Sequence, residues 1–187
     1  MSIKELKKQL KEEKLNYYDK NIFKRIFYII SARPNVIIYK ILKDAKLYRY
    51  YKDNHKYFFQ KIMLLYLARK VNRNSMKYSI ELYGTFGNNL KICHGPILLN
   101  GYCHLGNNVI LHGFNCIGAK HLKDDAPVIG NNVDIGVGAV ILGNVVIADG
   151  IKIGANSVVT KSFLEQNITI AGVPAKKIKE AANKWKK

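Results

Sequence analysis

Aliphatic residues return at every sixth position through the second half of the chain. The series consists of Leu99, Leu105, Leu111, Ile117, Ile129, Ile135, Ile141, Ile147, Ile153 and Val159. The next residue is usually glycine or alanine, and another small or aliphatic residue lies four positions on. A helix repeats every 3.6 residues and a strand every two, so neither sustains this period. A solenoid does, when each turn has three short flat faces that share one core.

A sandwich of short strands is the alternative architecture for such a segment. A sandwich requires turn signals about 8–12 residues apart, which the six-residue spacing does not provide. The prediction is therefore a mainly β fold, a parallel β-helix over residues 79–174. Two interruptions are expected: one extra residue at Cys93–Pro96, and a polar segment, Gly118–Pro127, that leaves the coil as a loop.

Residues 1–78 are a different kind of chain, with apolar residues at helical spacing and Pro34 as their only proline. We expect an α-helical domain, with helices at about 3–14, 19–32, 35–50 and 54–74. Open ends of a solenoid need cover, because unpaired strand edges associate with other chains. The domain is interpreted as a cap of the coil, with a separate binding domain as the alternative. Residues 175–187 are expected to form a basic tail.

The formal net charge is +18, from 31 Lys and Arg against 13 Asp and Glu. Nucleic acid is the partner that such a charge first suggests, but no nucleic-acid recognition motif accompanies it. We therefore expect no nucleic acid. A phosphorylated cofactor fits the charge better, and so does peripheral contact with an anionic membrane surface.

Composition limits the cellular setting and the chemistry. Three cysteines, an odd number, argue against a disulfide framework. The cysteines and the five histidines lack metal-ligand spacing, so no metal is expected. The N-terminal sequence MSIKELKKQLKEEK has no apolar run of a signal peptide, and no apolar segment is long enough to span a bilayer. We expect a cytoplasmic protein, at most peripheral to the membrane.

Two segments near the C-terminus carry a family resemblance. GANSVVTK (154–161) and AGVPAKKIK (171–179) resemble the C-terminal signature of the hexapeptide-repeat acyltransferases, which include serine acetyltransferase and the galactoside acetyltransferases. The resemblance implies a left-handed coil, acetyl-CoA as co-substrate, and a homotrimer with active sites between subunits. More narrowly, His94, His112 and the segment 124–127 look like serine-acetyltransferase-like proteins associated with surface-polysaccharide biosynthesis.

The same resemblance assigns the catalytic residues. His94 occupies the place of the family's general base, and His112 matches a second histidine of the polysaccharide-linked subgroup. A positioned neutral histidine is suited to deprotonate an acceptor hydroxyl, which typically accelerates a reaction by about 10²–10⁴-fold. The alternative is that each histidine is merely hydrogen-bonded to neighbouring backbone.

Cofactor contacts follow from the galactoside acetyltransferase pattern. The implied residues are Gly136, Val137, Ala155, Thr160, Lys161, Lys176 and Lys179. Small residues leave room for the pantetheine arm along the coil, and lysines supply point charges for phosphates. The alternative is that these lysines only solvate a basic tail.

The acceptor side departs from serine acetyltransferase. Ser79 replaces an aspartate that orients the base, and Asp125–Ala126 replaces an Arg-His pair that holds serine. Acidic side chains suit sugar hydroxyls better than a carboxylate, so Glu81, Asp124 and Asp125 are expected to bind a saccharide acceptor. The predicted function is O-acetylation of a sugar, a surface polysaccharide or its precursor. Serine O-acetylation in cysteine biosynthesis is one alternative, and a noncatalytic β-helix scaffold or binding module is another.

Overall fold

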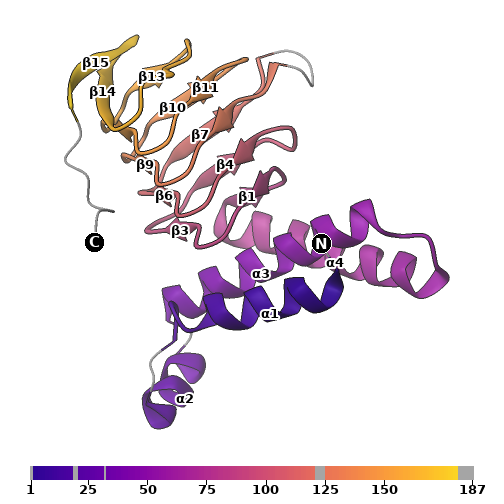
Figure 1. Cartoon of the computed structure of the whole chain (residues 1–187). Coiled ribbons are helices and arrows are strands. Elements are labelled where there is room, and N and C mark those ends of the chain that lie inside the picture. The colour runs from indigo at the N-terminus through magenta and orange to yellow at the C-terminus, as the bar shows by residue number, and fades with distance from the viewer. Residues whose placement is uncertain (1, 19–20, 32, 121–124, 181–187) are drawn as a thin grey trace. The chain divides into compact units, whose positions relative to one another are not determined.

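The structure is a computed structural model that describes residues 2–18, 21–31, 33–120 and 125–180. The chain divides into two compact units, residues 1–74 and 75–187. The first unit is helical, and the second is a β-coil that begins after the last turn of the fourth helix (Figure 1).

The described residues before the coil form four helices: α1 (Ile3–Lys14), α2 (Ile22–Ile30), α3 (Pro34–Asp53) and α4 (Phe58–Tyr78). Local signals set three of their starts. Ser2 and Glu5 form a reciprocal capping box on α1. The Asn21 side chain accepts from the amides of α2. Pro34 occupies the first turn of α3. The expected helices are present, but α4 runs four residues beyond the expected end.

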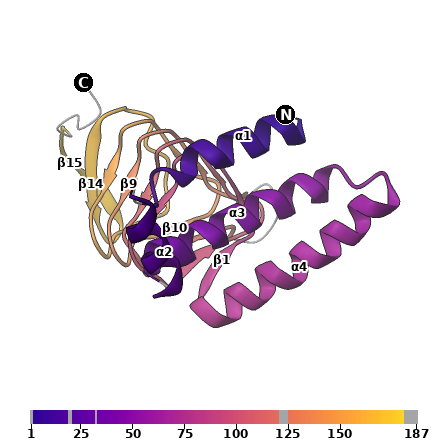
Figure 2. The same ribbon diagram turned by 90° about the horizontal axis from the view of Figure 1, so that it is seen from below.

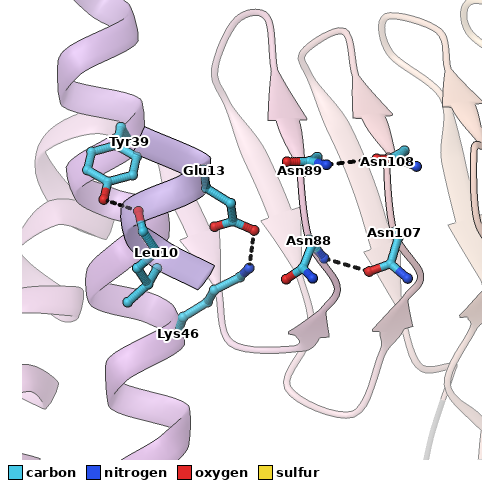
Figure 3. Close-up of polar contacts among 8 residues, drawn as sticks. All are labelled: Leu10, Glu13, Tyr39, Lys46, Asn88, Asn89, Asn107 and Asn108. Carbon is cyan, nitrogen blue, oxygen red and sulfur yellow. Dashed lines mark hydrogen bonds and ion pairs between the residues drawn. The ribbon is translucent and has the colours of Figure 1, made fainter. Parts of the chain in front are cut away.

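Polar contacts join the helices of the first unit. The Tyr39 hydroxyl donates to the Leu10 carbonyl at 2.8 Å, and Lys46 pairs with Glu13 at 2.6 Å, so α3 is fixed to α1 (Figure 3). Asp44, buried on α3, accepts from Lys70 of α4 at 3.0 Å. Leu6 and Leu10 of α1 are buried, as are Ile38 and Leu42 of α3.

Fifteen short strands follow in the described part of the second unit, and they form three sheets. Sheet 1 contains β1 (Ile80–Leu82), β4 (Ile97–Leu99), β7 (Asn115–Gly118), β10 (Val140–Leu142) and β13 (Val158–Val159). Sheet 2 contains β2 (Thr85–Phe86), β5 (His104–Leu105), β8 (Val128–Ile129) and β11 (Val146–Ile147). Sheet 3 contains β3 (Lys91–Ile92), β6 (Ile110–Leu111), β9 (Asp134–Ile135), β12 (Lys152–Ile153), β14 (Ile168–Gly172) and β15 (Ala175–Glu180).

From β1 to β13 the chain visits the three sheets in rotation, and successive strands of each sheet pair in parallel, as in β3, β6 and β9. The turns therefore lie over one another in Figure 2. The sixth-position aliphatic residues point inward, and Leu105, Ile135 and Ile141 are fully buried. The predicted parallel β-solenoid is confirmed.

Asparagines line the corner between sheets 2 and 3. Asn89, Asn108 and Asn132 all have positive φ, a conformation that asparagine tolerates better than most residues. Asn89 Nδ2 donates to Asn108 Oδ1 at 3.0 Å (Figure 3). Asn108 Nδ2 donates in turn to Asn132 Oδ1 at 2.9 Å. Asn107 Oδ1 accepts from the Asn88 amide at 2.7 Å. This asparagine ladder connects successive turns through side chains as well as backbone.

The end of the coil differs from the expectation of a tail. Residues 175–180 form β15, which pairs antiparallel with β14. Antiparallel pairing requires a hairpin, which a six-residue repeat does not encode. Pairing with β15 also covers the edge of β14. The loop predicted at Gly118–Pro127 falls between β7 and β8, and its residues 121–124 lie outside the described part of the chain.

Candidate active site

Both predicted catalytic histidines lie at one corner of the coil, between sheet 3 and sheet 1. The corner consists of residues 93–96, 112–114, 136–139 and 154–157, one segment from each of four turns. We call it the histidine corner. It brings together His94, His112, Val137 and Ala155, which are widely spaced in the sequence.

Backbone hydrogen bonds fix the register of this corner from turn to turn. The amides of Cys93, His112 and Gly136 donate to carbonyls of the next turn at 2.8–3.1 Å. Asn115, which is buried, accepts from the Gly113 amide at 2.9 Å and donates to the Gly136 carbonyl at 2.7 Å. The histidines are therefore held on a rigid frame rather than on a free loop.

His94 is exposed, and within the described residues no group hydrogen-bonds to its ring. Gly113 of the next turn lies against it: a Cβ at Gly113 would be only 3.0 Å from the His94 Cβ. Gly113 also has a φ of +120°, which strongly favours glycine. A glycine at this position therefore leaves room for the His94 side chain.

His112 differs from His94 because a carboxylate orients it. Its Nε2 lies 2.8 Å from Asp134 Oδ1, and the His112 and Asp134 side chains are 44% and 17% exposed. Sequence reasoning missed Asp134. The coil register could have found it, because Ile110, two residues before His112, pairs with Asp134 in the neighbouring turn.

A pocket of about 400 Å³ opens beside this corner, on the outer face of sheet 1. Its lining residues are Ser75, Met76, Ser79, Glu81, Pro96, Ile97, Leu98, Phe114, Asn115 and Cys116. Pro96 and Phe114 belong to the histidine corner, whereas Ser75 and Met76 come from the last turn of α4. No lysine or arginine is among the described residues that line it.

The structure divides the predicted acceptor residues. Glu81 lines the pocket, on the outward face of β1. Asp125 is half-buried before β8 and is not among the lining residues. Asp124 lies outside the described residues. Cys116, which the prediction did not include, lines the pocket, and burial raises the pKa of its thiol.

The predicted cofactor residues lie at three places. Gly136, Val137 and Ala155 belong to the histidine corner, and Val137 and Ala155 are exposed there. Thr160 and Lys161 follow β13, at the corner where the chain leaves sheet 1. Lys176 and Lys179 are exposed on β15, at the edge of sheet 3. The predicted cofactor residues of a single subunit therefore do not lie along one corner of the coil.

Neither a metal cluster nor a membrane span is present in the described part of the chain. Within it, no group of three histidine, cysteine or acidic side chains could hold a metal ion. None of its helices combines the length and apolar character needed to cross a membrane.

Comparisons with known proteins extend this description. The serine acetyltransferase of Buchnera aphidicola from Schizaphis graminum is 33% identical over 118 residues, covering 60% of this chain and 45% of the relative. The serine acetyltransferase of Staphylococcus aureus Mu50 is 33% identical over 132 residues, covering 67% of this chain and 61% of the relative. The chain thus spans about half the length of the curated relatives it matches. No protein-family model matches it.

Solved structures match along nearly the whole chain. The crystal structure of serine acetyltransferase from Brucella abortus S19 has a TM-score of 0.73 and 26% identity, covering 96% of this chain and 71% of that one. The same enzyme in complex with coenzyme A gives a TM-score of 0.71, again at 26% identity, covering 97% and 70%. This chain and the Brucella enzyme therefore share helices followed by a parallel solenoid.

The parallel coil, its six-residue repeat and these matches place the chain in the class of hexapeptide-repeat folds. Within that class it is homologous to the serine acetyltransferases. The matches give no support to the narrower expectation of a surface-polysaccharide subgroup.

Proposed function

We propose that this chain transfers an acetyl group from acetyl-CoA to an acceptor hydroxyl, with His94 as the general base. The observation that carries the proposal is an exposed histidine, unpartnered among the described residues, on a rigid corner next to a pocket. A relative with the same fold forms a complex with coenzyme A, which supports the choice of donor.

The reaction asks little of the protein because a thioester is already activated. The acceptor O–H gives its proton to the His94 ring as its oxygen attacks the thioester carbonyl carbon. The C–S bond then breaks, and the proton passes from the imidazolium to the departing sulfur of coenzyme A. Backbone amides near the carbonyl oxygen would stabilise the charge that develops there.

His112 and Asp134 supply a second, fixed polar group one turn away. Because Asp134 accepts from Nε2 of His112 at 2.8 Å, the ring is held in one orientation. We assign the His112–Asp134 pair to acceptor positioning. A ring in a fixed orientation can hydrogen-bond one polar group of the acceptor while His94 deprotonates the hydroxyl that reacts. Losing it should raise the KM for the acceptor more than it lowers kcat.

The cofactor residues fit coenzyme A best if two subunits share the site. Exposed Ala155 and Val137 leave the corner open for the pantetheine arm, and Lys161, Lys176 and Lys179 offer charge for phosphates. These groups lie at different places on one chain. A homotrimer in which the corner of one subunit faces the lysines of its neighbour would bring them together.

Two acceptors have support. The relatives are serine acetyltransferases, so serine is the first candidate and is favoured over the sugar that the sequence alone predicts. A specific observation keeps a sugar hydroxyl as the second. The described pocket lining includes Glu81 and no basic residue that could pair with the carboxylate of serine.

A panel of acceptors separates these candidates. Thiol release from acetyl-CoA is measured with L-serine, nucleotide sugars and oligosaccharides. A kcat/KM for serine of about 10⁴ M⁻¹s⁻¹ or more, with sugars inert, assigns serine. The reverse pattern assigns a sugar. No thiol release with any acceptor, together with no binding of acetyl-CoA, contradicts the transferase and favours a scaffold.

The base is tested by three matched alanine variants. His94→Ala should lower kcat by about 10²-fold or more while leaving acetyl-CoA affinity nearly unchanged. His112→Ala should act mainly on the KM of the acceptor. His104→Ala is the control, because His104 lies on sheet 2, away from the histidine corner. Full activity in His94→Ala with loss in His112→Ala would transfer the role of base to His112.

The cofactor contacts are tested by replacing Lys161, Lys176 and Lys179 together with alanine. The KM for acetyl-CoA should rise, and salt should weaken binding less than in the parent, because screened charges have been removed. Alanine at Lys7, Lys8 and Lys11, which are exposed on α1, removes the same charge elsewhere. If the two triple variants raise the KM for acetyl-CoA equally, the lysines act through the overall charge of the protein and not through contacts with the cofactor.

A further inference from the structure

Helix α2 turns its apolar face toward solvent. Six of its nine residues are isoleucine or phenylalanine with large exposed fractions: Ile22 54%, Phe23 78%, Ile26 48%, Phe27 58%, Ile29 43% and Ile30 78%. A surface helix of a folded domain normally buries such a face. Among the side chains of this helix whose exposure is described, Tyr28 is the half-buried one.

These six residues lie on one side of the helix. At 100° per residue they fall within one continuous arc of about half the circumference, and Lys24 and Tyr28 lie on the opposite side. The helix is also fixed at its start, because Asn21 Oδ1 accepts from the Phe23 amide at 2.9 Å. The apolar arc is therefore presented by a capped helix.

The unit that carries α2 is strongly basic. Residues 1–74 contain 19 of the 31 Lys and Arg but only 6 of the 13 Asp and Glu, a net charge of +13 out of +18. Lys24 is exposed on the polar side of α2, and Arg33, also exposed, stacks on Tyr28 with 4.2 Å between the guanidinium carbon and the ring centre. An apolar arc with cations around it is typical of a helix that lies in the plane of a membrane interface.

We propose that α2 docks the helical unit on an anionic lipid bilayer, with its six apolar side chains inserted between the headgroups. Isoleucine and phenylalanine enter the boundary of the acyl chains, while Lys24 and Arg33 remain at the level of the phosphates. The remaining positive charge of the unit adds attraction to anionic lipid over about a Debye length.

A second copy of the chain is the main competing occupant of this face. Two helical units at +13 each would have to approach within a few ångströms to bury their α2 faces. The repulsion between them opposes that contact, whereas a bilayer with anionic headgroups neutralises the same charge. Charge complementarity therefore favours lipid.

Vesicle flotation tests the proposal with the full chain. The probes are vesicles of phosphatidylcholine alone and of phosphatidylcholine mixed with an equal amount of phosphatidylglycerol. The parent should float with the mixed vesicles and not with phosphatidylcholine alone, and added salt should reduce the bound fraction. Changing Phe23, Phe27 and Ile30 together to serine should lower the bound fraction by about tenfold or more.

A matched variant on α4 controls for general hydrophobicity. Phe58 and Phe59 are 72% and 81% exposed, and changing both to serine should leave flotation unchanged. Far-UV circular dichroism checks that each variant folds. The proposal is overturned if the parent does not float or if the α2 variant floats as well as the parent. A change of oligomer size in the α2 variant, with no flotation of the parent, would assign the face to a second copy.

Discussion

The two units use the same apolar residue types in opposite ways. In the coil the repeating aliphatic side chains are buried, and Ile129, Ile135 and Ile141 are at most 1% exposed. In α2, Ile26 and Ile30 are 48% and 78% exposed. The difference lies in the neighbours: each turn of the coil is covered by the next, whereas one helix cannot cover its own apolar side. A repeat therefore builds its own core, and an amphipathic helix depends on what covers it.

The largest expected effect comes from one substitution made in both regions. Ile135→Ala should destabilise the coil by about 2–5 kcal/mol, because it removes buried methylene groups and leaves a cavity between turns. Ile26→Ala should change stability by less than about 0.5 kcal/mol, because the side chain already faces water. Urea unfolding followed by circular dichroism measures both. Equal losses at the two positions would mean that α2 is covered within the folded chain.

A second prediction concerns the polar contact that joins α3 to α4. Asp44 is 3% exposed and accepts from Lys70 Nζ at 3.0 Å and from Asn74 Nδ2 at 3.4 Å. Asp44→Ala should destabilise the helical unit by about 1–3 kcal/mol, since the two donors lose their acceptor. Asp53→Ala is the control, because its carboxylate is exposed and its ion pair is with Arg49 of the same helix. Equal stability of the two variants in urea unfolding would refute a role for the buried contact.

The asparagine ladder gives a third, smaller effect in the coil. Asn108→Ala removes a donor and an acceptor of the ladder and places alanine at a φ of 57°. The expected loss is about 1–2 kcal/mol. Asn108→Gly keeps the backbone conformation accessible but also loses the side-chain bonds, so it should be the less destabilised variant. If the two unfold at the same urea concentration, backbone strain contributes nothing.

The fold was predictable from sequence where the pattern is local. The six-residue period identifies the inward residues from Leu99 to Val159 and so predicts the coil, because each turn repeats the same constraint. Helix starts at Ser2 and Pro34 follow from short-range capping chemistry. β15 was not predictable from the repeat, because its antiparallel pairing with β14 depends on a hairpin outside the period.

The geometry of the candidate site was predictable only in part, because it depends on the register of successive turns. His94 and His112 could be selected one by one, but their shared corner and the Asp134 contact depend on how successive turns align. The pocket could not be foreseen, because it combines the outer face of sheet 1 with the last turn of α4. Likewise, the sequence of α2 defines which residues share a side and is silent on what covers them.

The smallest effect is a chemical one that reports on the coil alone, because the cysteines lie only in the second unit. Burial raises the pKa of the Cys103 thiol from its ordinary 9.0 to about 11, and Cys103 is 1% exposed. The thiolate is the reactive form, so Cys103 should resist iodoacetamide at pH 8 in the folded protein and react once urea unfolds the coil.

The difference in the Cys103 pKa between the folded and unfolded states also determines how the stability of the coil changes with pH. The unfolded thiol loses its proton first as pH rises from about 9 toward 11, so the unfolded state then binds fewer protons and the coil loses stability. Cys103→Ala should abolish this contribution while leaving the helical unit unchanged. Mass spectrometry of peptides after alkylation, with and without urea, measures the reactivity. Rapid alkylation of Cys103 at pH 8 without urea would show that the core of the coil is accessible to solvent in the folded protein. It would contradict the contrast between a buried coil core and an exposed apolar face of α2.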